Sequence, residues 1–102
     1  MKKFHIALSV ADIQKSVEDY SRRLGMSPEL VIENEYALWR TETLNFSIRR
    51  TGEGIGALRH IGWEDPAALS FTSDTDVNGV LWENFAEPHQ KAEIENFWPS
   101  KK

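Results

Sequence analysis

The fold of this chain is decided by one stretch near its start, Phe4-His-Ile-Ala-Leu-Ser-Val-Ala-Asp12, with its continuation Ile13-Gln-Lys-Ser-Val-Glu-Asp-Tyr-Ser-Arg-Arg-Leu-Gly25. The first part alternates apolar residues with small or polar ones, which is the pattern of a half-buried strand. The second part has a good helix N-cap in Asp12, apolar residues at helical spacing and a left-handed stop in Gly25. We therefore predict a strand, then a helix of about three turns that covers the Phe4 face of the strand.

The remaining strands and helices are predicted from the sequence that follows this stretch. Strand formers at hairpin-length spacing predict three more strands in the first half, and the glycine-rich segment 52–56 predicts a boundary between two units. Beyond it we expect a strand, a short helix opened by Asp65-Pro66, a break at the turn formers of 72–76, and a final strand. The expected strands are 29–33, 36–41, 44–50, 58–64 and 79–86, and the apolar residues Ile94, Phe97 and Trp98 predict an anchored C-terminal turn or helix.

The two halves resemble each other. Each opens with a strand that carries a histidine, His5-Ile6-Ala7 and His60-Ile61-Gly62, which indicates an internal repeat. Residues 65–78 leave no room for a full helix and two strands, because a parallel crossover alone takes about a dozen residues. We therefore expect a single domain with module one at about 1–51, a shortened module two at about 57–86 and a tail at 87–102. The face left uncovered predicts a homodimer.

Composition limits the function classes. The chain has 102 residues, a formal net charge of −4 and only 12 lysines and arginines, which disfavours nucleic acid because backbone binding needs a basic face. No apolar run approaches the roughly 20 residues that cross a bilayer, and the start is no signal peptide. We therefore expect a cytoplasmic protein without a membrane partner. Because cysteine is absent, a metal ion would be held by nitrogen and oxygen.

Three residues could carry metal chemistry. His5, His60 and Glu83 each lie within a predicted strand, and the period of two places both histidines away from the apolar, helix-covered face. Glu83 shares its face with Leu81 and Phe85, where an unpaired carboxylate would be costly. Two imidazoles and one carboxylate on a common face form a facial triad with open coordination positions, which suits Fe²⁺ and Mn²⁺.

Each of these residues also has a plainer interpretation. A strand histidine is often a surface or hydrogen-bonded residue. Glu83 is equally placed to form a salt bridge with Arg49 or Arg59. His89 follows a proline in the polar tail and is predicted to be a surface residue.

The same residues carry a resemblance to a known family. The stretch from His5 to Gly25 resembles the opening of the vicinal oxygen chelate superfamily, which contains glyoxalase I, bleomycin-resistance proteins, fosfomycin-resistance transferases and extradiol dioxygenases. His60-Ile-Gly-Trp63 is similar to the opening strand of that family's second module, and Asp76-Val-Asn-Gly-Val-Leu-Trp-Glu83 is similar to its closing segment. The resemblance implies an α+β fold in which paired βαβββ-type modules form a curved mixed sheet, here with a shortened second module.

The resemblance also implies a site. Carried over residue by residue, the family's metal ligands correspond to His5, His60 and Glu83. The last strand of module one offers Asn45 and Ser47 but no carboxylate, which favours a three-ligand site over the four-ligand site of the glyoxalases. Fe²⁺ or Mn²⁺ is favoured as the cofactor, and Zn²⁺ or Ni²⁺ also fits.

The sequence is compatible with more than one class of function. The favoured hypothesis is a metal-dependent lyase or dioxygenase of this superfamily that acts on a small substrate with adjacent oxygens. The alternatives are a non-catalytic protein of the same fold that sequesters a small molecule, and a degenerate member without chemistry. The residues expected to shape the pocket are Tyr36, Trp39, Ser47 and Arg49, with Arg49 placed either to bind a substrate carboxylate or phosphonate or to lie in solvent.

Overall fold

The first half of the chain has the β-α-β-β-β order that its sequence predicts. In a computed structural model, which describes residues 1–52 and 54–99, the elements are β1 (Lys3–Val10), α1 (Ile13–Leu24), β2 (Leu30–Ile32), β3 (Tyr36–Arg40) and β4 (Leu44–Arg50). Helix α1 begins where the Asp12 carboxylate accepts a 3.0 Å hydrogen bond from the backbone nitrogen of Lys15. It ends at Gly25, whose φ of 72° is left-handed. The predicted cap and stop are both confirmed.

The second half consists of β5 (Leu58–Glu64), β6 (Thr72–Thr75), β7 (Leu81–Phe85) and α2 (Glu87–Phe97). Two expectations are wrong here. Asp65 opens a turn and no helix, with its carboxylate accepting a 2.9 Å hydrogen bond from the backbone nitrogen of Ala67. The turn formers of 72–75 form a strand, because pairing with β7 satisfies their backbone groups and their exposed side chains have no burial to lose.

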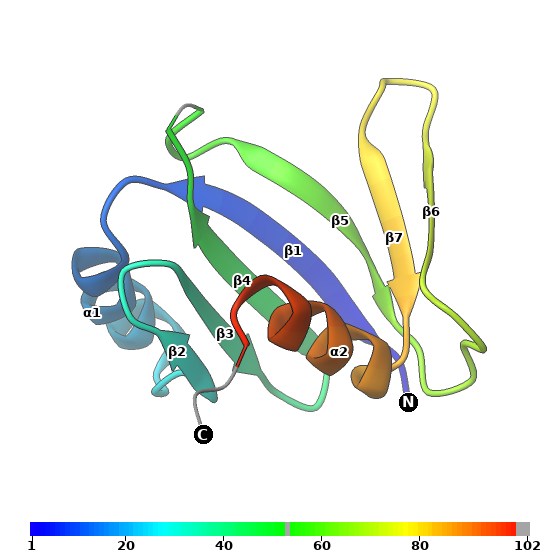
Figure 1. Ribbon diagram of the computed structural model, residues 1–102, viewed down its shortest axis with the longest axis horizontal. Helices are drawn as coiled ribbons and strands as arrows, with labels where there is room; N and C mark the ends of the chain where they lie inside the picture. Colours follow the sequence, from blue (N-terminus) through cyan, green and yellow to red (C-terminus); the bar gives the residue numbers. More distant parts are fainter. Residues whose placement is uncertain (53, 100–102) are drawn as a thin grey trace.

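The strands form one curved, open sheet in the order β2-β3-β4-β1-β5-β7-β6 (Figure 1). In the first half β1 pairs in parallel with β4, and β3 pairs antiparallel with β4. The second half repeats this arrangement, since β5 pairs in parallel with β7 and β6 pairs antiparallel with β7. Within residues 54–86 there is no counterpart of α1 or β2. The α+β fold with a shortened second module is therefore confirmed.

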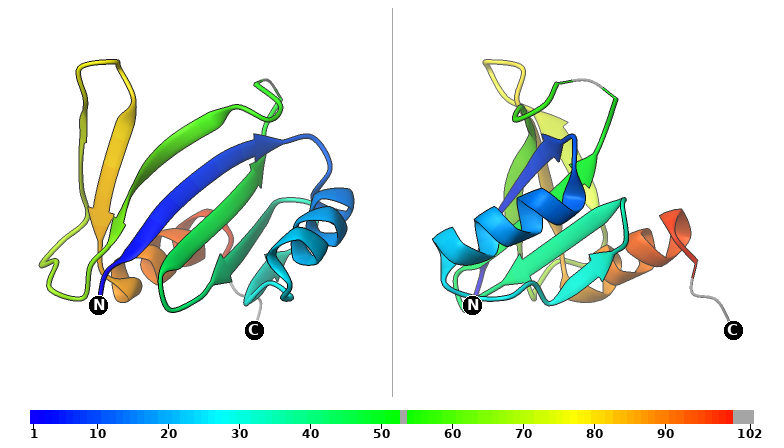
Figure 2. Two further views of the ribbon diagram at one scale, coloured as in Figure 1. Left: turned by 180° about the vertical axis from the view of Figure 1, so that it is seen from behind. Right: turned by 90° about the vertical axis from the view of Figure 1, so that its left-hand side faces the viewer.

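The two helices lie on opposite faces of the sheet (Figure 2). Helix α1 packs over β3 and β4, where its apolar stripe closes a core on the Phe4 face of β1, as predicted. The centre of this core consists of Val10, Ile13, Ala37, Trp39 and Ile48. The opposite face, which carries His5 and His60, is the one that α2 covers.

Among residues 1–52 and 54–99, no helix covers the second half of the α1 face. Here β1, β5 and β7 present apolar side chains, and Trp63 is 38% exposed although its ring packs edge-on against that of Phe4 at 5.1 Å. This uncovered face consists of Phe4, Ile6, Ile61, Trp63 and Trp82, which pair with one another across the three strands. It is the apolar surface that the missing helix of the second module would have covered.

The expected homodimer can be tested on the uncovered face. Sedimentation velocity at micromolar concentration is expected to show a dimer for the wild type and a shift toward monomer for Trp63→Glu, because a second copy would remove this apolar surface from water. Leu69→Glu is the matched control, since Leu69 is 97% exposed in the loop before β6. A wild-type monomer would contradict the expectation.

Candidate metal centre

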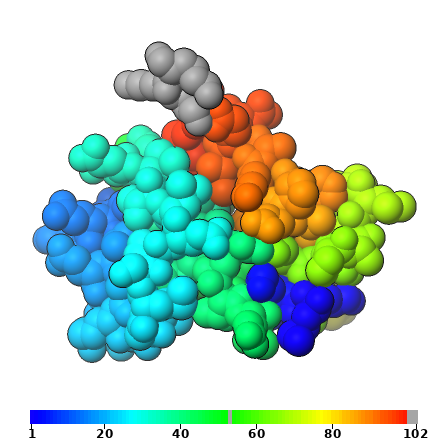
Figure 3. All heavy atoms as spheres, turned by 90° about the horizontal axis from the view of Figure 1, so that it is seen from below, coloured from blue at the N-terminus to red at the C-terminus, as the bar shows by residue number. Residues whose placement is uncertain are grey.

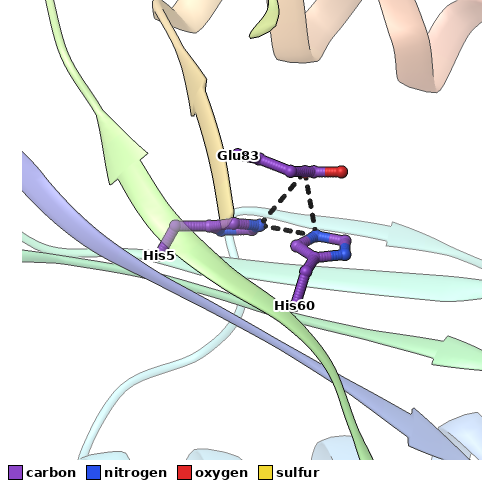
Figure 4. A group of neighbouring side chains, drawn as sticks. All are labelled: His5, His60 and Glu83. Carbon is purple, nitrogen blue, oxygen red and sulfur yellow. Dashed lines mark hydrogen bonds and ion pairs between the residues drawn. The ribbon is translucent and has the colours of Figure 1, made fainter. Parts of the chain in front are cut away.

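Sheet register brings the three predicted ligands to one face. In the antiparallel pair of β1 and β5, His5 lies opposite Gly62 and Ala7 lies opposite His60, so both histidines project to the same side. In the parallel pair of β5 and β7, Gly62 lies beside Glu83. Residues that are far apart in the sequence thus meet on the α2 side of the sheet, and their side chains point toward one another (Figure 4).

The ligand atoms are spaced as neighbours around one ion would be. His5 Nε2 and His60 Nε2 are 2.9 Å apart, and His60 Nε2 and Glu83 Oε1 are 3.0 Å apart. Two atoms bound at right angles to an ion at about 2.1 Å each are about 3.0 Å apart, so both pairs fit adjacent coordination positions. His5 Nε2 and Glu83 Oε1 are 3.9 Å apart, which is a wider pair. Two imidazole nitrogens and one carboxylate oxygen also form a donor set that divalent transition metals accept.

The two histidines are buried, and burial keeps His5 in the metal-binding form. His5 is 2% exposed and His60 is 8% exposed. Burial, with a further contribution from the neighbouring His60, lowers the pKa of His5 to about 4. His5 is therefore neutral at physiological pH, and a neutral imidazole is the form that coordinates a metal ion.

A buried hydrogen-bond network fixes the orientation of His5. The Asn45 side chain donates from Nδ2 to Glu64 Oε1 and to Gln90 Oε1, both at 2.8 Å, so its Oδ1 faces His5. Because Oδ1 can only accept, His5 Nδ1 donates the 2.9 Å hydrogen bond and leaves the lone pair of Nε2 for the cluster. Glu64 is in turn held by a two-bond contact with Arg40 at 2.9 and 2.6 Å.

Close packing of β5 on β7 places Glu83. A Cβ atom at Gly62 would overlap the carbonyl oxygen of Glu83 and lie 2.8 Å from its carbonyl carbon. Glycine alone permits this approach of the two backbones, and the approach carries the Glu83 carboxylate to His60.

A cavity of about 100 Å³ lies between the cluster and α2. Tyr36, Ser47 and Arg49 line it together with the three candidate ligands, as the sequence predicts. The wall opposite the sheet comes from α2 and the residue after it, through Gln90, Glu93, Ile94, Phe97 and Trp98. In the space-filling view α2, orange to red, lies between the cyan segment around β2 and the yellow-green segment before β6 (Figure 3).

The assignment of Trp39 to the pocket is wrong. Trp39 is fully buried in the core beneath α1, and its indole nitrogen donates a 3.2 Å hydrogen bond to the carbonyl oxygen of Met26. It stands three positions from Tyr36 on β3, and an odd separation on a strand places two side chains on opposite faces. Tyr36 faces the cavity, so Trp39 faces the core.

The structure also bears on the plainer interpretations of Glu83 and His89. Within residues 1–52 and 54–99, Glu83 has ion-pair distances to His60 and His5 and to neither Arg49 nor Arg59. His89 is half-buried, and its Nδ1 accepts a 2.9 Å hydrogen bond from the backbone nitrogen of Ala86 at the start of α2. Three further residues line the cavity and were not predicted as pocket residues from the sequence: Arg59, from the bulged strand β5, and Gln90 and Glu93, from α2.

No protein-family model matches the chain, and no curated protein sequence matches it significantly. Among the described residues, no helix has the length and apolar character needed to span a bilayer. A proposal of function therefore rests on the two unequal modules and on the His/His/Glu cluster between their sheet and α2.

Proposed function

We propose that this chain is a metal-dependent member of the vicinal oxygen chelate superfamily that acts on a small substrate with adjacent oxygens. His5, His60 and Glu83 hold a divalent ion, with Fe²⁺ or Mn²⁺ favoured and Zn²⁺ or Ni²⁺ also compatible. The observation that carries the proposal is the convergence of these side chains, whose ligand atoms all lie within 4.8 Å of one another. The paired modules and the resemblance of the opening stretch support the same class.

The chain's own residues prepare the site for such a substrate. The bound ion supplies a Lewis acid that stabilises negative charge developing on the substrate oxygens. Asn45 holds His5 in one tautomer and orientation, and α2 forms the wall of the cavity opposite the sheet. Burial raises the pKa of Tyr36 to about 12, so its hydroxyl stays protonated and can donate a hydrogen bond to a substrate oxygen.

Metal content tests this proposal directly. Protein purified without chelators or metal-affinity steps is expected to contain about one metal ion per chain by elemental analysis. The metal-free protein is expected to melt at a higher temperature when Fe²⁺, Mn²⁺, Zn²⁺ or Ni²⁺ is added, because binding to the folded state stabilises it. His60→Ala and Glu83→Gln are expected to lose both effects, since each leaves only two of the three ligands.

His89→Gln is the matched control, because His89 lies at the start of α2 and outside the cluster. It is expected to bind metal as the wild type does. Identical melting temperatures of the wild type with all four metals, together with no metal in the purified protein, would contradict the proposal.

The second candidate function is non-catalytic binding of a small molecule. It is favoured by the aromatic wall of the cavity, where the rings of Tyr36 and Trp98 lie 5.1 Å apart. The same variants separate the two functions. A binding protein is expected to retain its ligand when His5 and His60 are replaced by alanine, whereas a metalloenzyme is expected to lose it.

A further inference from the structure

An irregularity in β5 turns a second arginine into the cavity. Ala7 of β1 lies opposite His60, but Leu8 lies opposite Leu58, so Arg59 is an extra residue in this ladder. In a regular strand Arg59 and His60 would project to opposite faces. The bulge allows both side chains to line the same cavity, and bulges next to functional sites commonly redirect a side chain in this way.

Arg49 reaches the same cavity from β4. Its guanidinium carbon lies 4.4 Å from the ring centre of Phe97 and 5.2 Å from that of Trp98. An arginine that packs on aromatic rings uses the flat face of its guanidinium, so its in-plane N–H groups stay available as donors. Arg49 and Arg59 are both half-buried.

Neither guanidinium has an anionic partner at ion-pair distance in the described part of the chain. Other arginines differ in this respect: Arg40 contacts three carboxylates, and Arg50 contacts Glu35 at 3.3 Å. Both guanidiniums line one cavity, where burial lowers the pKa of Arg59 and the positive charge of Arg49 lowers it further. A half-buried pair of like charges lowers its free energy when an anion lies between them.

We propose that Arg59 and Arg49 bind an anionic group of the substrate beside the candidate metal centre. Guanidinium groups bind carboxylate, phosphonate and phosphate oxygens through paired hydrogen bonds, so the ligand of this subsite is an oxyanion of that kind. Together with the proposed function, on which this step rests, the substrate class is a small organic acid with adjacent oxygens at one end and an anionic group at the other. The anion subsite itself does not depend on the metal.

Substitution of Glu93 tests the direction in which anion affinity changes. This carboxylate lines the same cavity from α2, and burial, with the charge of Glu83, raises its pKa. Together with Glu83, it therefore competes with an incoming anion for the two guanidiniums. Removing its charge should strengthen anion binding, whereas damage to the fold would weaken it.

The experiment titrates the metal-free, chelator-treated full chain with inorganic phosphate at pH 8 and follows binding by calorimetry. The wild type is expected to bind saturably, and Arg59→Gln and Arg49→Gln are expected to bind at least about tenfold more weakly because each removes a charge-assisted pair of hydrogen bonds. Glu93→Gln is expected to bind several-fold more tightly. Arg50→Gln, an exposed arginine outside the cavity, is expected to behave as the wild type.

No saturable binding by the wild type, or an equal loss in Arg59→Gln and Arg50→Gln, would overturn the anion subsite. Circular dichroism of each variant identifies any that fails to fold, and the gain expected from Glu93→Gln still tests the proposal in that event. Metal content measured on the same preparations keeps the two proposals apart. Metal binding without phosphate binding would overturn the anion subsite and leave the proposed function in place. Phosphate binding without metal binding would overturn the proposed function and leave the anion subsite in place.

Discussion

Replacing Gly62 by alanine is expected to lower the free energy of unfolding by at least about 3 kcal/mol. The added methyl group would overlap the backbone of Glu83, and backbone atoms of two paired strands cannot yield as the end of a flexible side chain can. The strands β5 and β7 must separate to accept it, which weakens their pairing and moves Glu83 away from His60. Urea denaturation followed by circular dichroism measures the loss of stability.

Gly52→Ala is the matched control, because no heavy atom lies within 4 Å of a Cβ built at Gly52. It is expected to change stability by less than about 1 kcal/mol. Metal binding gives a second measurement, since a folded Gly62→Ala protein is expected to bind metal more weakly than the control. Equal stability of the two variants would show that β5 and β7 do not approach as closely as described.

The first half of the fold could be predicted because its signals are local. Asp12 caps α1 and Gly25 ends it through contacts within a few residues, so both ends of the helix can be predicted from the neighbouring sequence alone. The strand Thr72–Thr75 carries no such signal. Its polar residues form a strand only because β7 offers a partner, and pairing between strands is a property of the fold that a local pattern of turn formers cannot reveal.

The candidate site also contains residues that could be predicted from the sequence and residues that could not. The histidines could be found because each lies in an alternating strand, and the resemblance linked them to Glu83. Trp39 could have been excluded by its odd separation from Tyr36 on one strand. Arg59 could not be found, because a one-residue bulge reverses the face that simple alternation assigns to it.

The buried network behind His5 is also hidden from sequence analysis. Asn45, Glu64 and Gln90 come from three separate elements, and nothing in their spacing relates them to one another. Their hydrogen bonds nevertheless determine which nitrogen of His5 faces the cluster. The position of a candidate metal ligand is thus fixed by residues that no spacing motif includes.

Removal of the Arg40 side chain is expected to destabilise the protein by about 3–5 kcal/mol in Arg40→Met. The side chain of Glu64 is only 6% exposed, and Arg40 holds it through two hydrogen bonds. Without Arg40, a carboxylate stays buried with Asn45 as its remaining hydrogen-bond donor. Arg50→Met removes a half-exposed ion pair instead and is expected to cost less than about 1 kcal/mol.

The effect of Arg40→Met is expected to depend on pH in a defined direction. Burial opposes ionisation of Glu64, but the hydrogen bonds from Arg40 and Asn45 outweigh it, so the pKa of Glu64 lies below its ordinary value of 4.5. In the wild type, this contribution to stability is present above that value and is lost as the pH falls through the folded-state pKa. In the variant the unpaired carboxylate gains a proton on acidification, which relieves its burial cost. The stability difference between the two proteins should therefore be largest near pH 7 and should shrink toward about pH 4.

A second substitution separates the charge of Glu64 from its hydrogen bond. Glu64→Gln keeps an oxygen that accepts from Asn45 but removes the buried charge, so the double variant Arg40→Met/Glu64→Gln should recover most of the stability that Arg40→Met loses. It should also keep the metal affinity of the wild type, because Asn45 still donates to a side-chain oxygen at position 64 and so stays oriented toward His5. A double variant as unstable as Arg40→Met would mean that the packing of Arg40, and not the pairing of its charge with Glu64, supports the site.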